Sequence, residues 1–196
     1  MTTLLLCLML GVRFIAPEIH NGSTVVVGWG DSNTNLVWLS AIGDIGLRII
    51  PVHAGIGGNT VSQMIARFST DVAPYYENGA FCVILGGLND DVGGASVDTI
   101  YRRIQVACSL SQDAGFTTLI STYPMQGTVM YEVNDSIQAH WATFADGIID
   151  PTADAYIGEA ADHNNTTWFA NIYHFSTAGY QRYAVEYVRP AIRSLI

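Results

Sequence analysis

The sequence contains no lysine, and its eight basic residues are all arginines, against 17 aspartates and glutamates. The formal net charge is therefore -9. Proteins that bind nucleic acid through its phosphates carry a basic patch, so we expect no nucleic-acid partner. Only 13% of the residues are charged, whereas 49% are hydrophobic. This composition argues against a disordered chain and allows a sizeable buried core.

Cysteine is scarce as well, with three residues at positions 7, 82 and 108. An odd number of cysteines at these separations indicates neither a disulfide framework nor a zinc site. Cys82 and Cys108 fall in apolar segments, where we expect buried thiols. The sequence gives no sign of a cofactor or a metal.

No hydrophobic run has the roughly 20 residues that a membrane-spanning helix needs. Residues 4–12 form an apolar run of nine. This run lacks the basic flank and the small-residue cleavage site of a secretory signal, so we interpret residues 1–22 as an N-terminal apolar extension. Its surface would have to be covered by the domain or by a second subunit, and a homo-oligomer formed through it is one such arrangement. We interpret residues 23–196 as a single domain.

Apolar segments of strand length alternate along the domain with segments of helical periodicity. The predicted strands are residues 23–28, 47–53, 81–85, 117–123 and 147–150; the predicted helices are 33–46, 60–72, 96–114, 131–144 and 176–196, with Pro190 kinking or breaking the last; and 151–171 is predicted as a long polar loop. This alternation indicates right-handed βαβ units. We therefore predict an α/β fold, a flavodoxin-like three-layer α/β/α sandwich whose five-stranded parallel sheet has the order 2-1-3-4-5.

In such a sheet, ligands bind at the carboxyl ends of the strands where the strand order reverses. The loops after the first three predicted strands meet there. They hold Ser32, Gly58 and Asn89. We therefore expect these three residues to lie close together.

A serine becomes a nucleophile when a base takes its proton, and acyl transfer also needs donors for the oxyanion. We predict that Ser32 starts a helix, which would leave its own N–H free. Gly58 offers a second N–H with no Cβ in the way, and Asn89 offers a side-chain NH2. Of the five histidines, His174 is the best candidate base because it lies in a loop that enters the last helix.

These residues stand in four blocks that resemble those of the SGNH hydrolases, the GDSL-type esterase and lipase family. The blocks occur in the family's order: Gly30-Asp31-Ser32, Gly55-Ile56-Gly57-Gly58-Asn59-Thr60, Gly87-Leu88-Asn89-Asp90, and His174 followed by Ala178-Gly179-Tyr180. The resemblance implies that Ser32 is the nucleophile and His174 the general base. It also implies an oxyanion hole made by Ser32, Gly58 and Asn89.

The sequence departs from the family at one position. The family usually has an aspartate three residues before the histidine to orient it, and here that residue is Asn171. In a serine protease, the change of the orienting aspartate to asparagine lowers kcat by about 10⁴. Three interpretations stay open: a Ser-His dyad oriented by a backbone or Asn171 carbonyl, a substitute carboxylate such as Asp162, or a weak or silent enzyme.

The leading functional prediction is a serine ester hydrolase that acts on a small-molecule or carbohydrate ester. The absence of a long helical lid favours a short acyl group such as acetyl. The alternative is a catalytically weak or inactive carbohydrate-binding or structural module. Trp29, Trp168, Tyr131 and Tyr173 are candidates to line the substrate pocket. A Rossmann-type nucleotide-binding protein is disfavoured because no G-x-G-x-x-G follows the first strand.

Overall fold

A computed structural model of the chain describes residues 22–43, 45–124 and 129–196. Its centre is a five-stranded parallel sheet with the order β2-β1-β3-β4-β5. The strands are β1 (Ser23–Gly30), β2 (Arg48–Gly55), β3 (Phe81–Leu85), β4 (Thr117–Ser121) and β5 (Gly147–Ile149). The predicted fold class and strand order are therefore confirmed.

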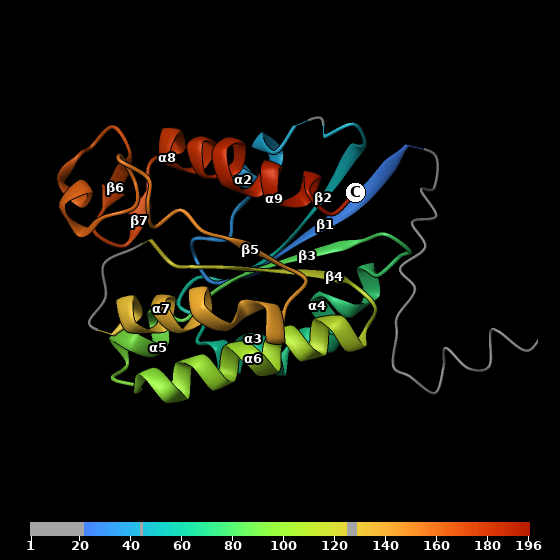
Figure 1. Ribbon diagram of the computed structural model, residues 1–196, viewed down its shortest axis with the longest axis horizontal. Coiled ribbons are helices and arrows are strands. Elements are labelled where there is room, and N and C mark those ends of the chain that lie inside the picture. The colour runs from blue at the N-terminus through green and yellow to red at the C-terminus, as the bar shows by residue number, and fades with distance from the viewer. Residues whose placement is uncertain (1–21, 44, 125–128) are drawn as a thin grey trace, which may run out of the picture.

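Helices cover both faces of this sheet (Figure 1). On one face lie α2 (Leu36–Ala41), α8 (Thr177–Arg182) and α9 (Arg189–Arg193), with a π-helical turn, η4 (Tyr183–Val188), between the last two. On the other face lie α3 (Val61–Ala66), α4 (Phe68–Asp71), α5 (Leu88–Val92), α6 (Val97–Asp113) and α7 (Met130–His140). Short 3₁₀ segments are η1 (Ala73–Tyr75), η2 (Trp141–Thr143) and η3 (Ala160–Asn164). The three layers follow from strands that are apolar on both sides.

The core lies between the central strands and both helical layers. All of β3 and all of β1 after Ser23 are buried. Cys82 and Cys108 are free and buried, as predicted. Trp29 was a candidate pocket residue, but its side chain is fully buried and its ring centroid lies 5.1 Å from that of Phe68. It is a core residue because a central strand has no solvent-facing side.

Three predicted helices differ from the observed ones. The first is confined to α2 because Asn35 caps it, accepting from the Val37 N–H. The second divides at Arg67 into α3 and α4. The last runs from α8 through η4 into α9 without a break at Pro190, which stands in the first turn of α9 directly after the π-helical turn. Proline lacks an N–H, and a π turn is one place where a helix tolerates an altered bonding pattern.

The predicted polar loop 151–171 contains structure that the sequence did not indicate. Besides η3, its end forms β6 (Phe169–Asn171), which pairs with β7 (His174–Phe175) as a small antiparallel hairpin. This hairpin brings Asn171 opposite His174. Residues 1–21, which contain nearly all of the predicted N-terminal extension, lie outside the described residues.

Candidate active site

Ser32 lies in a tight turn between β1 and α2. The Thr34 N–H donates to the Asp31 carbonyl at 3.1 Å, and the Asn33 N–H donates to Asp31 Oδ1 at 2.9 Å. The turn packs so closely on the end of β2 that a Cβ on Gly55 would lie 2.1 Å from the Thr34 carbonyl oxygen. Ser32 therefore precedes α2 instead of starting it, which corrects the prediction. Its N–H still donates no hydrogen bond within the described residues.

The Ser32 hydroxyl and the His174 ring are in direct contact. Ser32 Oγ lies 2.8 Å from His174 Nε2, and His174 Nδ1 lies 3.0 Å from Asn171 Oδ1. Asn171 Oδ1 also accepts the Tyr173 N–H at 2.9 Å, which fixes the amide with its oxygen toward the ring. Nδ1 must then carry the proton, so Nε2 is free to accept the Ser32 hydroxyl. This is the tautomer that a general base requires.

The position beside His174 is thus occupied by Asn171 and not by a carboxylate. The Asp162 side chain instead accepts the Glu159 N–H at 3.0 Å and caps η3. Of the three interpretations of the Asn171 position, the geometry favours the Ser-His dyad with an amide carbonyl as the orienting group.

Asn33, which follows Ser32 in the sequence, ties the turn to the histidine segment. Its Nδ2 donates to the Tyr173 carbonyl at 2.8 Å, and its Oδ1 accepts from the Tyr180 hydroxyl at 2.8 Å. Tyr173 directly precedes His174. The first of these bonds connects the Ser32 turn to the backbone next to His174, so it helps to fix the distance between Ser32 and His174.

Gly58 lies in a four-residue turn at the carboxyl end of β2. The Asn59 N–H donates to the Ile56 carbonyl at 3.2 Å, and Gly58 has a φ of +78°. A turn of this kind favours glycine at its third position. A methyl group on the neighbouring Gly57 would lie 3.7 Å from the Ser32 Cβ, so this turn lies beside Ser32. The Gly58 N–H donates no hydrogen bond within the part of the chain that is described.

Asn89 lies in α5, and this helix begins directly after Gly87. The φ of +116° at Gly87 turns the chain out of β3. Asn89 Nδ2 donates to the Asn59 carbonyl at 3.0 Å and lies 3.4 Å from Asp31 Oδ2. The first bond holds one amide hydrogen. The second bond is long and therefore weak, so a ligand oxygen would have to compete only with this weak bond for the other amide hydrogen. The three predicted oxyanion donors therefore lie on neighbouring segments that follow β1, β2 and β3.

The turn that holds Ser32 also contains a buried carboxyl group. Asp31 is fully buried, and its oxygens accept from the Tyr123 hydroxyl at 3.0 and 3.1 Å. Burial raises the pKa of Asp31 to about 7, against bonds from the Asn33 N–H and Tyr123 that lower it. Burial, followed by the nearby Asp31 charge, raises the pKa of Tyr123. Asp31 belongs to the Gly30-Asp31-Ser32 block, but no sequence pattern links it to Tyr123, because the two residues are 92 positions apart. The contacts of Asn33 and Tyr123 become visible only in the structure.

Comparison with known proteins adds evidence about the fold. No protein-family model matches the sequence, and no curated protein matches it. Solved structures do match, among them a GDSL-like lipase from Bacteroides thetaiotaomicron, 20% identical over 92% of this chain and 93% of that chain with a TM-score of 0.68. An acetylxylan esterase from Geobacillus stearothermophilus is 16% identical over 86% of this chain and 93% of that chain, with a TM-score of 0.66. A member of the lipolytic G-D-S-L family from Veillonella parvula is 19% identical over 83% of this chain and 94% of that chain, with a TM-score of 0.67. The chain has the fold of the SGNH hydrolases.

Within this SGNH fold, the remaining candidate aromatics lie at or near the carboxyl edge of the sheet. Tyr131 and Tyr173 are each 38% exposed. The Trp168 ring packs against the Arg182 guanidinium at 5.5 Å, and Arg182 also forms an ion pair with Asp154. Tyr131 and Tyr173 are thus the candidates with side chains open to a ligand.

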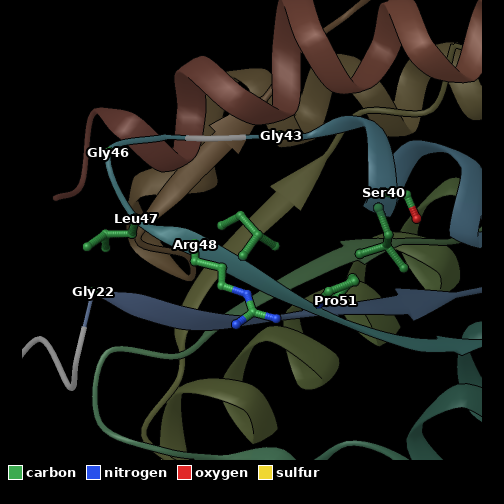
Figure 2. Close-up of a pocket in the computed structure, with 9 residues that line it drawn as sticks. Gly22, Ser40, Gly43, Gly46, Leu47, Arg48 and Pro51 are labelled. Carbon is green, nitrogen blue, oxygen red and sulfur yellow. The ribbon is translucent and has the colours of Figure 1, made fainter.

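A separate pocket of about 500 Å³ lies at the opposite, amino-terminal edge of the SGNH sheet (Figure 2). Gly22, Gly46 and Arg48 line it, at the starts of β1 and β2. It contains none of the predicted site residues.

Within the described ranges there is no cluster of three or more His, Cys, Asp or Glu residues that could hold a metal ion. None of the described helices is long and apolar enough to cross a bilayer.

Proposed function

We propose that the chain is a serine ester hydrolase in which Ser32 is the nucleophile and His174 the general base. The observation that carries the proposal is the hydrogen-bonded series Ser32 Oγ, His174 Nε2, His174 Nδ1 and Asn171 Oδ1, with distances of 2.8 and 3.0 Å. A serine is activated when its hydroxyl donates to an unprotonated nitrogen of a histidine ring, here Nε2, while the other ring nitrogen, Nδ1, donates its hydrogen to an orienting group.

In the first half of the reaction, Ser32 Oγ attacks the ester carbonyl carbon while its proton passes to His174 Nε2. The carbonyl electrons move to the oxygen, which the N–H groups of Ser32 and Gly58 and the Asn89 amide stabilise. The tetrahedral intermediate collapses, its bond to the alcohol oxygen breaks, and the alcohol leaves with the proton from Nε2. In the second half, a water molecule gives a proton to His174 Nε2 as its oxygen attacks the acyl carbon. The bond between that carbon and Ser32 Oγ then breaks, Oγ takes the proton back from Nε2, and the acid is released.

The neutral Asn171 holds the ring in place but cannot stabilise its positive charge as a carboxylate would. The protonated ring forms in both halves of the reaction, so this site gives up part of the electrostatic stabilisation of a full triad. We infer that the enzyme works as a dyad with a reduced rate constant.

We propose a short acyl group, such as acetyl, on a carbohydrate or another small ester. The two longest described helices, α6 (Val97–Asp113) and α7 (Met130–His140), lie on one face of the sheet (Figure 1), so neither forms a lid that could enclose a long acyl chain. The exposed rings of Tyr131 and Tyr173 provide flat apolar surfaces that suit a sugar ring. One of the solved structures with this fold is an acetylxylan esterase.

The test is turnover of a chromogenic acetyl ester by the wild type and by Ser32→Ala. We expect the substitution to abolish turnover, because no other hydroxyl among the described residues is bonded to a histidine ring nitrogen. Ser109→Ala is the matched control, since Ser109 is exposed on α6. Turnover that survives in Ser32→Ala would refute the assignment. A series of acetyl, butyryl and octanoyl esters tests the acyl preference, which is contradicted if the octanoyl ester has the highest kcat/KM.

Asn171 favours a second candidate function, a carbohydrate-binding or structural module that kept the fold and lost useful activity. Such a module would hydrolyse no ester either as the wild type or as Asn171→Asp. A clear gain in rate in Asn171→Asp would instead indicate a working site that lacks only its orienting charge.

A further inference from the structure

Arg67 is an interior arginine whose guanidinium bonds to several segments of the site. It follows α3 directly, and its side chain is 13% exposed. Nη2 donates to the Gly30 carbonyl at 2.7 Å, Nη1 to the Ala54 carbonyl at 2.8 Å, and Nε to Asn59 Oδ1 at 2.9 Å. Asp71 balances the charge, with an oxygen 3.0 Å from Nη1.

The acceptors of these bonds adjoin all three proposed oxyanion donors. Gly30 ends β1 and is two residues before Ser32, and its carbonyl also accepts the Ile56 N–H at 3.2 Å. Asn59 is the neighbour of Gly58. The backbone carbonyl of the same Asn59 accepts from Asn89 Nδ2 at 3.0 Å.

The bonding pattern requires an arginine. A guanidinium presents five N–H groups in a rigid plane, so it can reach three acceptors on two strands and a loop at once. An ammonium group is a single point on a flexible stem and cannot span the same acceptors. The guanidinium therefore fixes the spacing between the end of β1, the end of β2 and the turn that holds Gly58.

We propose that Arg67 is a positioning residue that holds the Ser32, Gly58 and Asn89 donors at the relative positions that bind the oxyanion. It acts through Gly30, Ala54 and Asn59 and does not touch the substrate. The inference rests on the proposed ester hydrolysis. Loss of one oxyanion donor costs about 10²–10³ in kcat in a serine protease, and a displacement of about 1 Å costs about 10².

The test is the kinetics of Arg67→Met and Arg67→Lys with a chromogenic acetyl ester. We expect kcat to fall about 30-fold in Arg67→Met, with KM changed less than about 3-fold, because the donors act on the transition state more than on the bound ester. Arg67→Lys keeps the charge but not the planar fork, so its kcat should fall about 10-fold. Asn59→Ala removes one of the three links and should lower kcat with a smaller loss of stability.

Arg189→Met is the matched control. Arg189 is also partly buried and also donates to backbone carbonyls, those of Ile42 at 2.5 Å and Ala41 at 3.2 Å, but these lie at the end of α2. We expect this variant to lose thermal stability and keep its kcat. A kcat in Arg67→Met and Arg67→Lys equal to that of Arg189→Met would overturn the proposal, as would a rise in KM at constant kcat.

A second measurement separates failure of this inference from failure of the proposed function. If wild-type protein hydrolyses no ester, or Ser32→Ala retains the activity, the function is wrong and kinetics cannot judge Arg67. NMR chemical shifts then report the positions of the donors directly. The relevant resonances are those of the Ser32 and Gly58 backbone amides and the Asn89 side-chain amide. We expect larger shifts in Arg67→Lys than in Arg189→Met. Shifts no larger than those of Arg189→Met would refute the positioning role, whatever the reaction.

Discussion

Replacing Asn171 with aspartate adds a negative charge beside His174 and leaves the rest of the site unchanged. Asn171 Oδ1 is 3.0 Å from His174 Nδ1, so a carboxylate there would have its charge about 4 Å from that of the protonated ring. Two unit charges at that distance attract by about 1 kcal/mol in water and about 4 kcal/mol at an effective dielectric constant of 20. Because Asn171 is exposed and His174 is half-buried, we expect about 1–2 kcal/mol.

This energy corresponds to a gain of about 5- to 30-fold in kcat/KM for Asn171→Asp. The gain is far below the 10⁴-fold effect of the equivalent change in a serine protease, where the amide imposes the wrong tautomer. Here the Tyr173 N–H already fixes the amide oxygen toward Nδ1, so only the charge is missing.

The assay is a pH–rate profile of acetyl ester hydrolysis by both proteins. A carboxylate stabilises the protonated ring, so the acidic limb of the profile should move up by about one pH unit. The rate gain should therefore be full above that limb and shrink below it. Asn171→Ala, which removes the oxygen that accepts both N–H groups, is the control and should lower kcat. A gain of 10³ or more in Asn171→Asp would show that the wild-type ring is in the wrong tautomer and refute the argument.

Three further results follow from the site. Burial raises the pKa of Asp31 to about 7. Between about pH 4 and pH 7, the folded protein therefore holds a proton on Asp31 that the unfolded chain releases. The free energy of unfolding should fall as the pH rises through that window. Urea unfolding should show a loss of about 3 kcal/mol from pH 5 to pH 8 that Asp31→Asn lacks; equal losses in both would contradict the shift. Asn89→Ala should lower kcat by about 10² with little change in KM, and an unchanged kcat would remove it from the oxyanion hole. Gly55→Ala should lower both the melting temperature and kcat, because the added Cβ would collide with the Thr34 carbonyl. Gly22→Ala is the control: its added Cβ would meet no atom within 4 Å, and its positive φ should cost only a modest amount of stability.

The sequence predicted the sheet and its loops because these depend on local patterns. Continuous apolar runs define strands such as β3, and glycines such as Gly58 and Gly87 mark the turns where the chain leaves them. Parallel topology then brings those turns to one edge. The proximity of the Ser32, Gly58 and Asn89 loops could be predicted for this reason.

The supporting contacts could not be predicted because they join residues that are distant in sequence. The hairpin of β6 and β7 could not be predicted either, because its segments of three and two residues are too short for any periodicity, although the resemblance to the SGNH hydrolases had already placed Asn171 at the position that orients His174. Arg67 sits within a helical pattern, where an arginine is typical of a solvated face. Trp29 was misjudged because an aromatic residue near a site can equally well belong to the core.

The central claim, that Ser32 is an activated nucleophile, is tested most directly by intact-mass analysis after treatment with a fluorophosphonate. This reagent phosphonylates activated serines whatever their natural substrate is. The account predicts that wild-type protein gains one adduct, located at Ser32, and that neither Ser32→Ala nor His174→Ala gains it. Wild-type protein without an adduct, or an adduct that persists in Ser32→Ala, would contradict it.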